Sequence, residues 1–219
     1  MVKTFRLSLL LLVLFLHAGC SSLLQSEGQR HSYMQSYLQQ AEPLILYYPS
    51  RLYTDEQTGL LSTENPAVSL AVFYDSDKEM YGLIERFVSE SPSLAASSPT
   101  IIAPGEWYDL NLSADTPVLF FYVSWQFIHQ YFPPDFTKFR LQASVLSKVI
   151  PLGQVLSAKG TIAFRSAAWE DTCQFSALNG EYYSIHEWQE SAAVRLTKSF
   201  DQIQLVCGQE LARKFNLSR

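Results

Sequence analysis

The segment from Val118 to Ile128 constrains the fold more than any other part of this 219-residue chain. Successive side chains of an extended strand point to opposite faces, so these residues divide into two rows. The first row is wholly apolar and the second begins with two aromatic residues: Leu119, Phe121, Val123, Trp125 and Phe127 in the first, Phe120 and Tyr122 in the second. A strand that is apolar on both faces needs cover on both sides. The segment therefore predicts a central strand.

Further strands are predicted on either side of it in the sequence. Residues 139–149 alternate apolar and polar side chains, which is typical of a half-buried strand. Residues 156–164 alternate in the same way after a turn at 151–154, so the two segments predict a hairpin. The apolar segments 44–48 and 68–74 are two shorter candidates. The expected sheet is mixed and largely antiparallel, with about five strands.

Two helices are predicted to pack on this sheet. Each begins with a capping box, in which a Ser side chain caps the helix and a Glu three residues later reaches back to the backbone; the boxes are Ser76 with Glu79 and Ser184 with Glu187. Apolar residues at spacings of three and four follow, to about residue 90 in the first helix and to Phe215 in the second. A break in the second is expected near residue 198. The chain from 43 to 219 is thus predicted to be one α+β domain with a long C-terminal helix.

The first 19 residues have the parts of a secretory signal peptide. Lys3 and Arg6 give a positive start, an apolar run over 7–16 follows, and small residues end it. A permanent membrane span needs about 20 apolar residues, so this run is too short for one. We expect residues 1–19 to be removed, so that the mature protein starts at residue 20.

The residues that follow this run carry a family resemblance. Ala18-Gly19-Cys20 resembles the lipobox of bacterial lipoproteins, although His17 stands where that family usually has an aliphatic residue. The resemblance implies cleavage before Cys20, attachment of a diacylglyceryl group to its sulfur and acylation, such as palmitoylation, of its amine. Two or more chains make membrane attachment stable. Under the family's sorting rule, Ser21 implies the outer membrane, with the protein facing the periplasm.

Residues 20–42 are polar and rich in Ser and Gln, and they are predicted to be a membrane tether with a short helix around Tyr33 to Leu38. The chain from Cys20 onward has 14 basic and 21 acidic residues, a net charge of −7. Such an acidic surface lacks the positive charge that binds the phosphates of nucleic acid, so no nucleic-acid partner is expected.

Two cysteines remain besides Cys20. In an oxidising periplasm, Cys173 and Cys207 predict a disulfide, because their spacing matches neither a redox motif nor a zinc site. The alternative is two buried free thiols.

From about Asp115 the chain resembles a family of uncharacterised proteobacterial envelope lipoproteins. The resemblance is carried by a strand that ends in Trp125, an aromatic-Pro-Asp-aromatic stretch, a long hairpin, a cysteine and a closing helix; the residues are Phe132, Pro133, Asp135, Phe136, Cys173, Leu196 and Cys207. The intervening Trp169 segment departs from that pattern. The family implies an envelope location and alternating strands and helices, and it brings no activity.

No catalytic, cofactor or metal site is predicted. His17 leaves with the signal, and His31, His129 and His186 lack ligand spacing. Cys173 acting as a nucleophile with His129 or His186 is an alternative to the disulfide. Glu187 and Glu190 are a candidate carboxylate pair, but they fit a cap and a solvated face more simply.

Aromatic residues near one loop suggest a contact surface. Trp107, Trp125, Tyr131 and Phe132 are the candidate partner-binding residues, with an all-core interpretation as the alternative. The expected function is a lipid-anchored structural or partner-binding component of an envelope assembly, most simply one that binds another envelope protein. A periplasmic carrier for a lipid or other apolar ligand is the first alternative, and a periplasmic hydrolase the second.

Overall fold

A computed structural model describes residues 28–54, 65–130, 137–157 and 167–218. In this part of the chain one mixed seven-stranded sheet has the main order β3-β1-β4-β5-β6, while β2 pairs with β4 and β7 with β5. The strands are β1 (Leu44–Tyr47), β2 (Leu52–Thr54), β3 (Thr100–Ile102), β4 (Pro117–His129), β5 (Lys138–Pro151), β6 (Trp169–Ser176) and β7 (Tyr183–Ser184). The helices are α2 (Pro66–Ser69), α3 (Ser76–Ser89), α4 (Pro92–Ser97), α5 (Leu152–Ser157) and α6 (Ile185–Leu217), with short 3-10 turns η2 (Ala71–Phe73), η3 (Glu106–Asp109) and η4 (Leu178–Gly180). The predicted α+β class and long C-terminal helix are confirmed.

The central position of β4 is confirmed as well. β4 pairs antiparallel with β5 over its whole length, from Pro117 opposite Pro151 to His129 opposite Phe139. On its other side it pairs in parallel with β1 and then with β2, which together follow one edge of β4 with a break between them.

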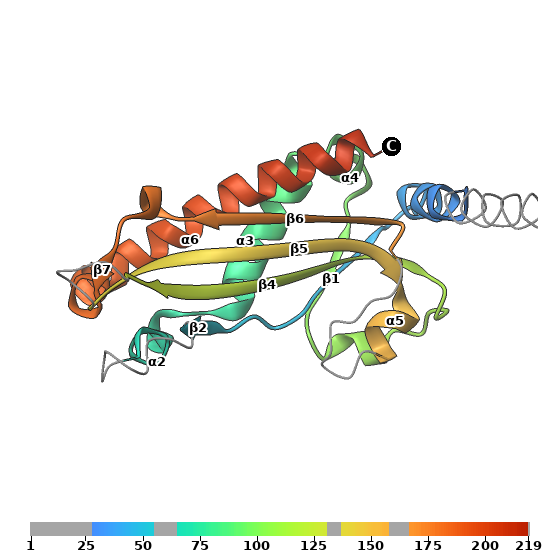
Figure 1. The fold of residues 1–219 in the computed structure, drawn as a ribbon. Coiled ribbons are helices and arrows are strands. Elements are labelled where there is room, and N and C mark those ends of the chain that lie inside the picture. Colours follow the sequence, from blue (N-terminus) through green and yellow to red (C-terminus); the bar gives the residue numbers. More distant parts are fainter. Residues whose placement is uncertain (1–27, 55–64, 131–136, 158–166, 219) are drawn as a thin grey trace, which may run out of the picture.

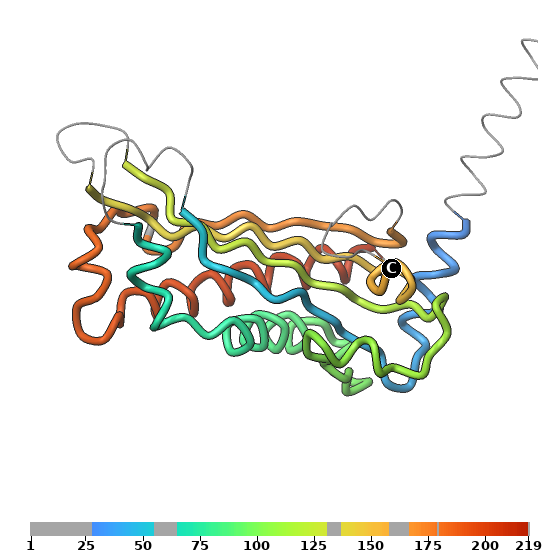
Figure 2. Tube along the Cα trace, turned by 90° about the horizontal axis from the view of Figure 1, so that it is seen from below, coloured from blue at the N-terminus to red at the C-terminus, as the bar shows by residue number. Residues whose placement is uncertain are grey.

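The helices α3 and α6 lie side by side on one face of the sheet (Figures 1 and 2). Phe87 of α3 packs edge-on against Phe121 of β4 and Phe215 of α6, with ring centroids 5.2 and 5.4 Å away. Trp125 packs in the same way on Phe200, at 4.9 Å. Large aromatic side chains therefore fill the main core between helices and sheet.

A smaller core lies on the opposite face, near the start of β4. Trp107 of η3 packs edge-on against Phe120 at 6.0 Å, and Leu46, Ile150 and Leu152 join them. This second cluster explains why the first residues of β4 are buried on both faces. Further along β4, alternate side chains are partly exposed.

The segment predicted to be a tether contributes to the fold in its second half. A helix over residues 28–38 buries Met34 and Tyr37 in the main core. The hydroxyl of Tyr33 donates to the carbonyl of Asp115 at 2.7 Å, and the amide of Gln40 donates to the carbonyl of Pro117 at 3.0 Å. Met34 and Tyr37 are three residues apart and so share one helix face, which docks at the start of β4.

One predicted strand and one predicted strand pairing are wrong. Residues 68–74 form α2 and η2, because Asn65 caps α2 through its side chain and Pro66 occupies the first helical turn. The partner of β5 is β6 rather than residues 156–164, whose start lies in α5 and whose remainder, from 158, lies outside the described residues.

The helix starts were predicted with mixed success. The capping box of Ser184 and Glu187 is confirmed. At α3 the cap is Asp75 instead of Ser76, and Glu79 is buried rather than turned back to the cap. The break in α6 falls at 190–193, where Ser191, Ala192 and Ala193 have left-handed backbone angles, and not near residue 198.

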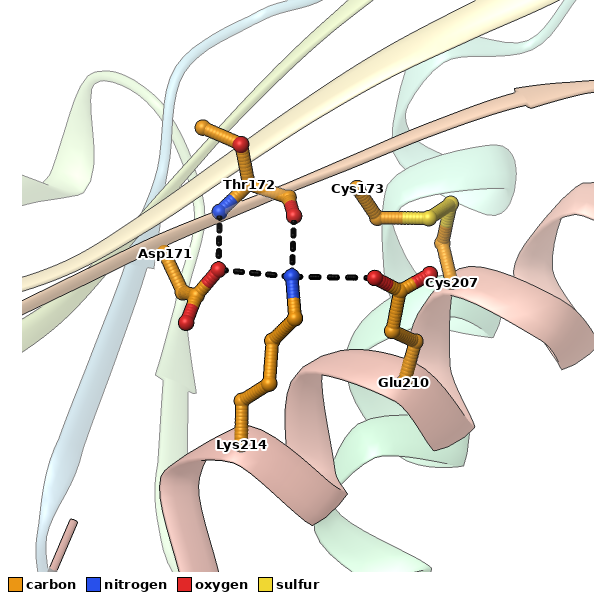
Figure 3. A network of polar contacts seen from close by, with 6 residues as sticks. All are labelled: Asp171, Thr172, Cys173, Cys207, Glu210 and Lys214. Carbon is orange, nitrogen blue, oxygen red and sulfur yellow. Dashed lines mark hydrogen bonds and ion pairs between the residues drawn. A yellow bond between two sulfur atoms is a disulfide. The ribbon is translucent and has the colours of Figure 1, made fainter. Parts of the chain in front are cut away.

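The structure contains the predicted disulfide between Cys173 of β6 and Cys207 of α6 (Figure 3). Beside it the ammonium group of Lys214 lies 2.7 Å from Asp171, 2.9 Å from Glu210 and 2.8 Å from the carbonyl of Thr172. Hydrogen bonds to Asp171 and then Glu210 raise the pKa of Lys214. The bridge and this network together fix α6 to the sheet's β6 edge.

Candidate binding surfaces

The predicted partner-binding residues do not gather on a surface in the described structure. Tyr131 and Phe132 lie outside the described residues, as does Cys20. Trp125 is fully buried and donates its indole N–H to Ser50 at 3.2 Å. Trp107 is 4% exposed in the smaller core. The core interpretation therefore holds for both tryptophans, because each fills the space between the sheet and a covering element.

The histidines and the cysteine considered for catalysis belong to three different elements, β4, α6 and β6. His129 is buried against Phe139, with ring centroids 5.0 Å apart, and His186 follows the cap of α6. Cys173 is held in the disulfide, so its sulfur is not a free nucleophile. Among the described residues no group of three His, Cys, Asp or Glu side chains could hold a metal ion.

A groove of about 580 Å³ separates the exposed sides of α3 and α6. Its lining is mostly polar: Gly82, Glu85, Arg86, Ser89, Asp201, Gln204 and Leu205. Glu79 lies at the same helix contact, where the amide of Gln204 donates to its carboxylate at 2.6 Å. Burial raises the pKa of Glu79 to about 7, and the nearby charge of Lys78 offsets part of that effect.

A second cavity, of about 340 Å³, lies where α6 bends, lined among others by Tyr183, Arg195 and Lys198. A carrier for an apolar ligand needs an enclosed and mainly apolar cavity. Neither of these two cavities has that character, so they give no support to the carrier hypothesis.

Exposed apolar side chains gather on α2 and η2. Val68 is 72% exposed, Val72 83% and Phe73 40%. We call these three residues the distal patch. Single exposed apolar residues are ordinary on protein surfaces, but neighbouring ones in an uncharged segment are typical of contact sites.

The distal patch lies far from the N-terminal helix. That helix packs at Asp115 and Pro117, at the start of β4, whereas β2 and α2 contact β4 near Trp125 to Phe127. At the rise of an extended strand, this separation is about 30 Å. Figure 1 shows the N-terminal helix at the right-hand end of the elongated domain and α2 at the left-hand end.

A second surface is formed by the sheet face opposite α3 and α6. Its central side chains are in register across β2, β4, β5 and β6 and carry no charge. We call it the open face; it consists of Tyr48, Tyr53, Tyr122, Ser124, Gln126, Gln142, Ser144, Leu146, Thr172, Gln174 and Ser176. These side chains are half-buried or exposed. The sheet holds them at fixed spacings.

Sequence reasoning missed both surfaces. The open face had a signal, because Tyr48, Tyr53 and Tyr122 each follow a residue that faces the main core, and alternation places them on the other face. The distal patch had no such signal, because the apolar residues of 68–74 predict a strand rather than an exposed helix.

Among the described residues, every helix is too short or too polar to span a bilayer. The chain matches no protein-family model and no curated protein sequence. The resemblance to an envelope lipoprotein family therefore stays a prediction.

Two solved structures are distantly similar. A candidate neuraminyllactose-binding hemagglutinin homolog from Helicobacter pylori has 9% sequence identity and a TM-score of 0.38, covering 80% of this chain and 91% of its own. A candidate lipoprotein from Caulobacter crescentus CB15 has 15% identity and a TM-score of 0.27, covering 86% of this chain and 90% of its own. One distant neighbour is thus a candidate lipoprotein, and similarities this low carry no argument about what this chain does.

Proposed function

We propose that the protein is a lipid-anchored component of the cell envelope that binds another envelope protein through its distal patch. The lipobox-like residues 18–20 support an anchor at Cys20, and Ser21 supports the outer membrane, with the protein facing the periplasm. The exposure of Val68, Val72 and Phe73 is the observation that supports the binding site.

The position of the patch suits this role. The anchored end of the chain leads into the helix over 28–38, and the patch lies about 30 Å further along the sheet. A partner could therefore reach the patch without competing with the membrane for the same end of the domain. Anchoring also confines both proteins to one surface, which raises their effective concentration.

Two matched charge substitutions test the proposal in the full-length lipidated protein. Val72→Asp places a carboxylate in the patch, and Leu217→Asp places one on the 74% exposed side chain at the end of α6, near the C-terminus marked in Figure 1. Affinity capture from detergent-solubilised envelopes should lose its co-purifying protein with Val72→Asp, by about ten-fold or more, and keep it with Leu217→Asp.

Both variants should unfold within about 0.5 kcal/mol of the wild type, because the substituted side chains are exposed. Equal capture by the wild type and Val72→Asp would refute the role of the patch. Equal loss in both variants would point to a general effect of added negative charge instead.

A further inference from the structure

Uncharged polar and aromatic side chains make up the centre of the open face. Its rows run across the strands: Tyr53, Gln126, Gln142 and Ser176 form one row, and Ser124, Ser144 and Gln174 the next. Tyr48 and Tyr122 stand beside them with ring centroids 6.3 Å apart. Burial, and then the proximity of Tyr53 and Tyr48, raises the pKa of Tyr122.

Charge is confined to the margins of this face. Lys148, 6% exposed, pairs with Glu170 at 3.0 Å, and the two are also register partners on β5 and β6. At the other end Arg140 lies over the ring of Tyr182, 5.2 Å from its centroid. A polyanionic ligand would need several cations along its path, and the rows between these margins provide none.

The same rows also fit poorly with a typical protein interface. The centre of such an interface is a desolvated apolar or aromatic cluster. Here the centre is made of amides and hydroxyls, and the tyrosines stand along one side. Covering these polar groups with an apolar partner would leave donors and acceptors unpaired, at a cost for each group.

We infer that the open face binds a neutral glycan chain. Gln, Ser and Thr side chains each donate and accept hydrogen bonds, as sugar hydroxyl and acetamido groups do. Tyrosine rings offer rigid apolar faces with a polar edge, which suits the carbon–hydrogen faces of pyranose rings. Four strands at the usual spacing give a row about 14 Å wide, so the surface accommodates an extended chain rather than a single sugar.

The sheet also lowers the cost of binding. β4 and β5 are paired over thirteen residue pairs, and β6 adds eight more, so the backbone under the open face is fixed before a ligand arrives. Preordered groups lose less conformational entropy on binding. This inference uses a different surface from the distal patch and goes beyond the proposed function.

Titration of the full-length detergent-solubilised protein with defined oligosaccharides tests the inference. The probes are chitohexaose, which is neutral and acetylated, cellohexaose, which is neutral with hydroxyls alone, and polygalacturonate, which is anionic. Binding of chitohexaose or cellohexaose is expected, and the comparison shows whether the acetamido group is needed. Failure of both neutral probes, or binding of polygalacturonate alone, would overturn the inference.

Substitutions locate the site. Tyr53→Ala with Tyr122→Ala should weaken the binding of the neutral probe by about ten-fold or more, whereas Tyr108→Ala, which removes a 68% exposed tyrosine outside the open face, should leave it unchanged. Gln174→Glu adds a charge at an exposed position of the face without removing buried volume, so it tests the same site if the tyrosine variant unfolds. Unchanged affinity in Gln174→Glu and in a folded tyrosine variant would refute the location. Capture of the protein partner through Val72 should be unaffected by all of these changes, so the two proposals can fail separately.

Discussion

Replacing Glu79 by Gln should remove part of the pH dependence of the protein's stability. The Glu79 side chain is buried between α3 and α6, 4% exposed, and its carboxylate accepts a hydrogen bond from Gln204 at 2.6 Å. The pKa of Glu79 is raised from 4.5 to about 7, and loss of hydration is the largest cause. Lys78 and the hydrogen bond from Gln204 lower this pKa, whereas the charges of Asp201 and Asp75 raise it. The folded protein therefore keeps this proton at pH values where the unfolded chain has released it.

The difference between the folded and unfolded pKa of Glu79 sets the sign and size of its effect on the free energy of unfolding. A raised pKa in the folded state gives stability that is fully present below pH 4.5 and is lost as the pH rises through about 7. A shift from 4.5 to about 7, at about 1.4 kcal/mol per pKa unit, corresponds to about 3 kcal/mol. A glutamine stays neutral, and its carbonyl oxygen can still accept from Gln204. Glu79→Gln should therefore match the wild type near pH 4.5 and exceed its free energy of unfolding by about 2–3 kcal/mol at pH 8.

Urea unfolding followed by tryptophan fluorescence at several pH values between 4.5 and 8 measures this difference. Subtracting the two proteins at each pH cancels the titration of the remaining carboxylates. Glu85→Gln is a suitable control, because Glu85 is an exposed carboxylate of the same helix. If the difference between Glu79→Gln and the wild type is the same at all pH values, Glu79 does not titrate as argued and the reasoning fails.

Further predictions concern the anchor, the disulfide and the close contact of the two helices. Cys20→Ala should block lipidation and cleavage, which mass spectrometry of the N-terminus would detect; an unmodified residue 20 in the wild type would contradict the lipoprotein hypothesis. Replacing Cys173 and Cys207 by Ala should lower the free energy of unfolding by about 2–4 kcal/mol, and two alkylatable thiols in envelope-derived wild-type protein would contradict the bridge. Gly208→Ala should cost about 1–3 kcal/mol in denaturant unfolding, because its Cβ would lie 2.7 Å from Cγ of Arg86 and 3.2 Å from the backbone of Phe87. Gly82→Ala should cost less, since its Cβ meets the flexible amide of Gln204, and equal losses would contradict this explanation.

The predictions from sequence succeeded where one local pattern decides the outcome. The central strand follows from Phe120 and Phe121, which point to opposite faces and are both buried. The start of α6 follows from the reciprocal bonds of Ser184 and Glu187, which involve residues three apart.

The predictions failed where long-range contacts or competing local signals decide. In β6 the core residues Trp169 and Cys173 are four apart with charged Glu170 and Asp171 between them, so the strand is defined by its pairing with β5 and not by its own alternation. At 68–74 the apolar sequence favoured a strand, but the Asn65 cap started a helix instead. The chemistry of the open face arises from side chains that come together only when β2, β4, β5 and β6 are in register.

The bend in α6 shows how a costly local conformation can be stabilised by one buried side chain. Ser191, Ala192 and Ala193 have φ values of 54°, 57° and 59°, and a left-handed residue other than glycine costs about 1–2 kcal/mol, so the three together cost about 3–6 kcal/mol. The bend allows the first turns of the helix to place Trp188 against Phe127, with ring centroids 5.6 Å apart. Trp188 is 1% exposed and donates its indole N–H to a backbone carbonyl of β5 at 3.1 Å. Burying an indole removes about 150–250 Å² from water, worth about 4–6 kcal/mol, which is similar to the strain.

Truncating this side chain should therefore release the bend. Trp188→Ala should lower the free energy of unfolding by about 3–5 kcal/mol, and native-state hydrogen exchange should show amides 185–193 exchanging faster than the change in global stability explains. Trp188→Phe keeps most of the buried area and loses the indole hydrogen bond, so it should cost about 1–2 kcal/mol and leave the bend in place. If Trp188→Ala costs less than about 1 kcal/mol, or if amides 185–193 keep the protection of the rest of α6, then the left-handed segment is held by contacts other than those of Trp188.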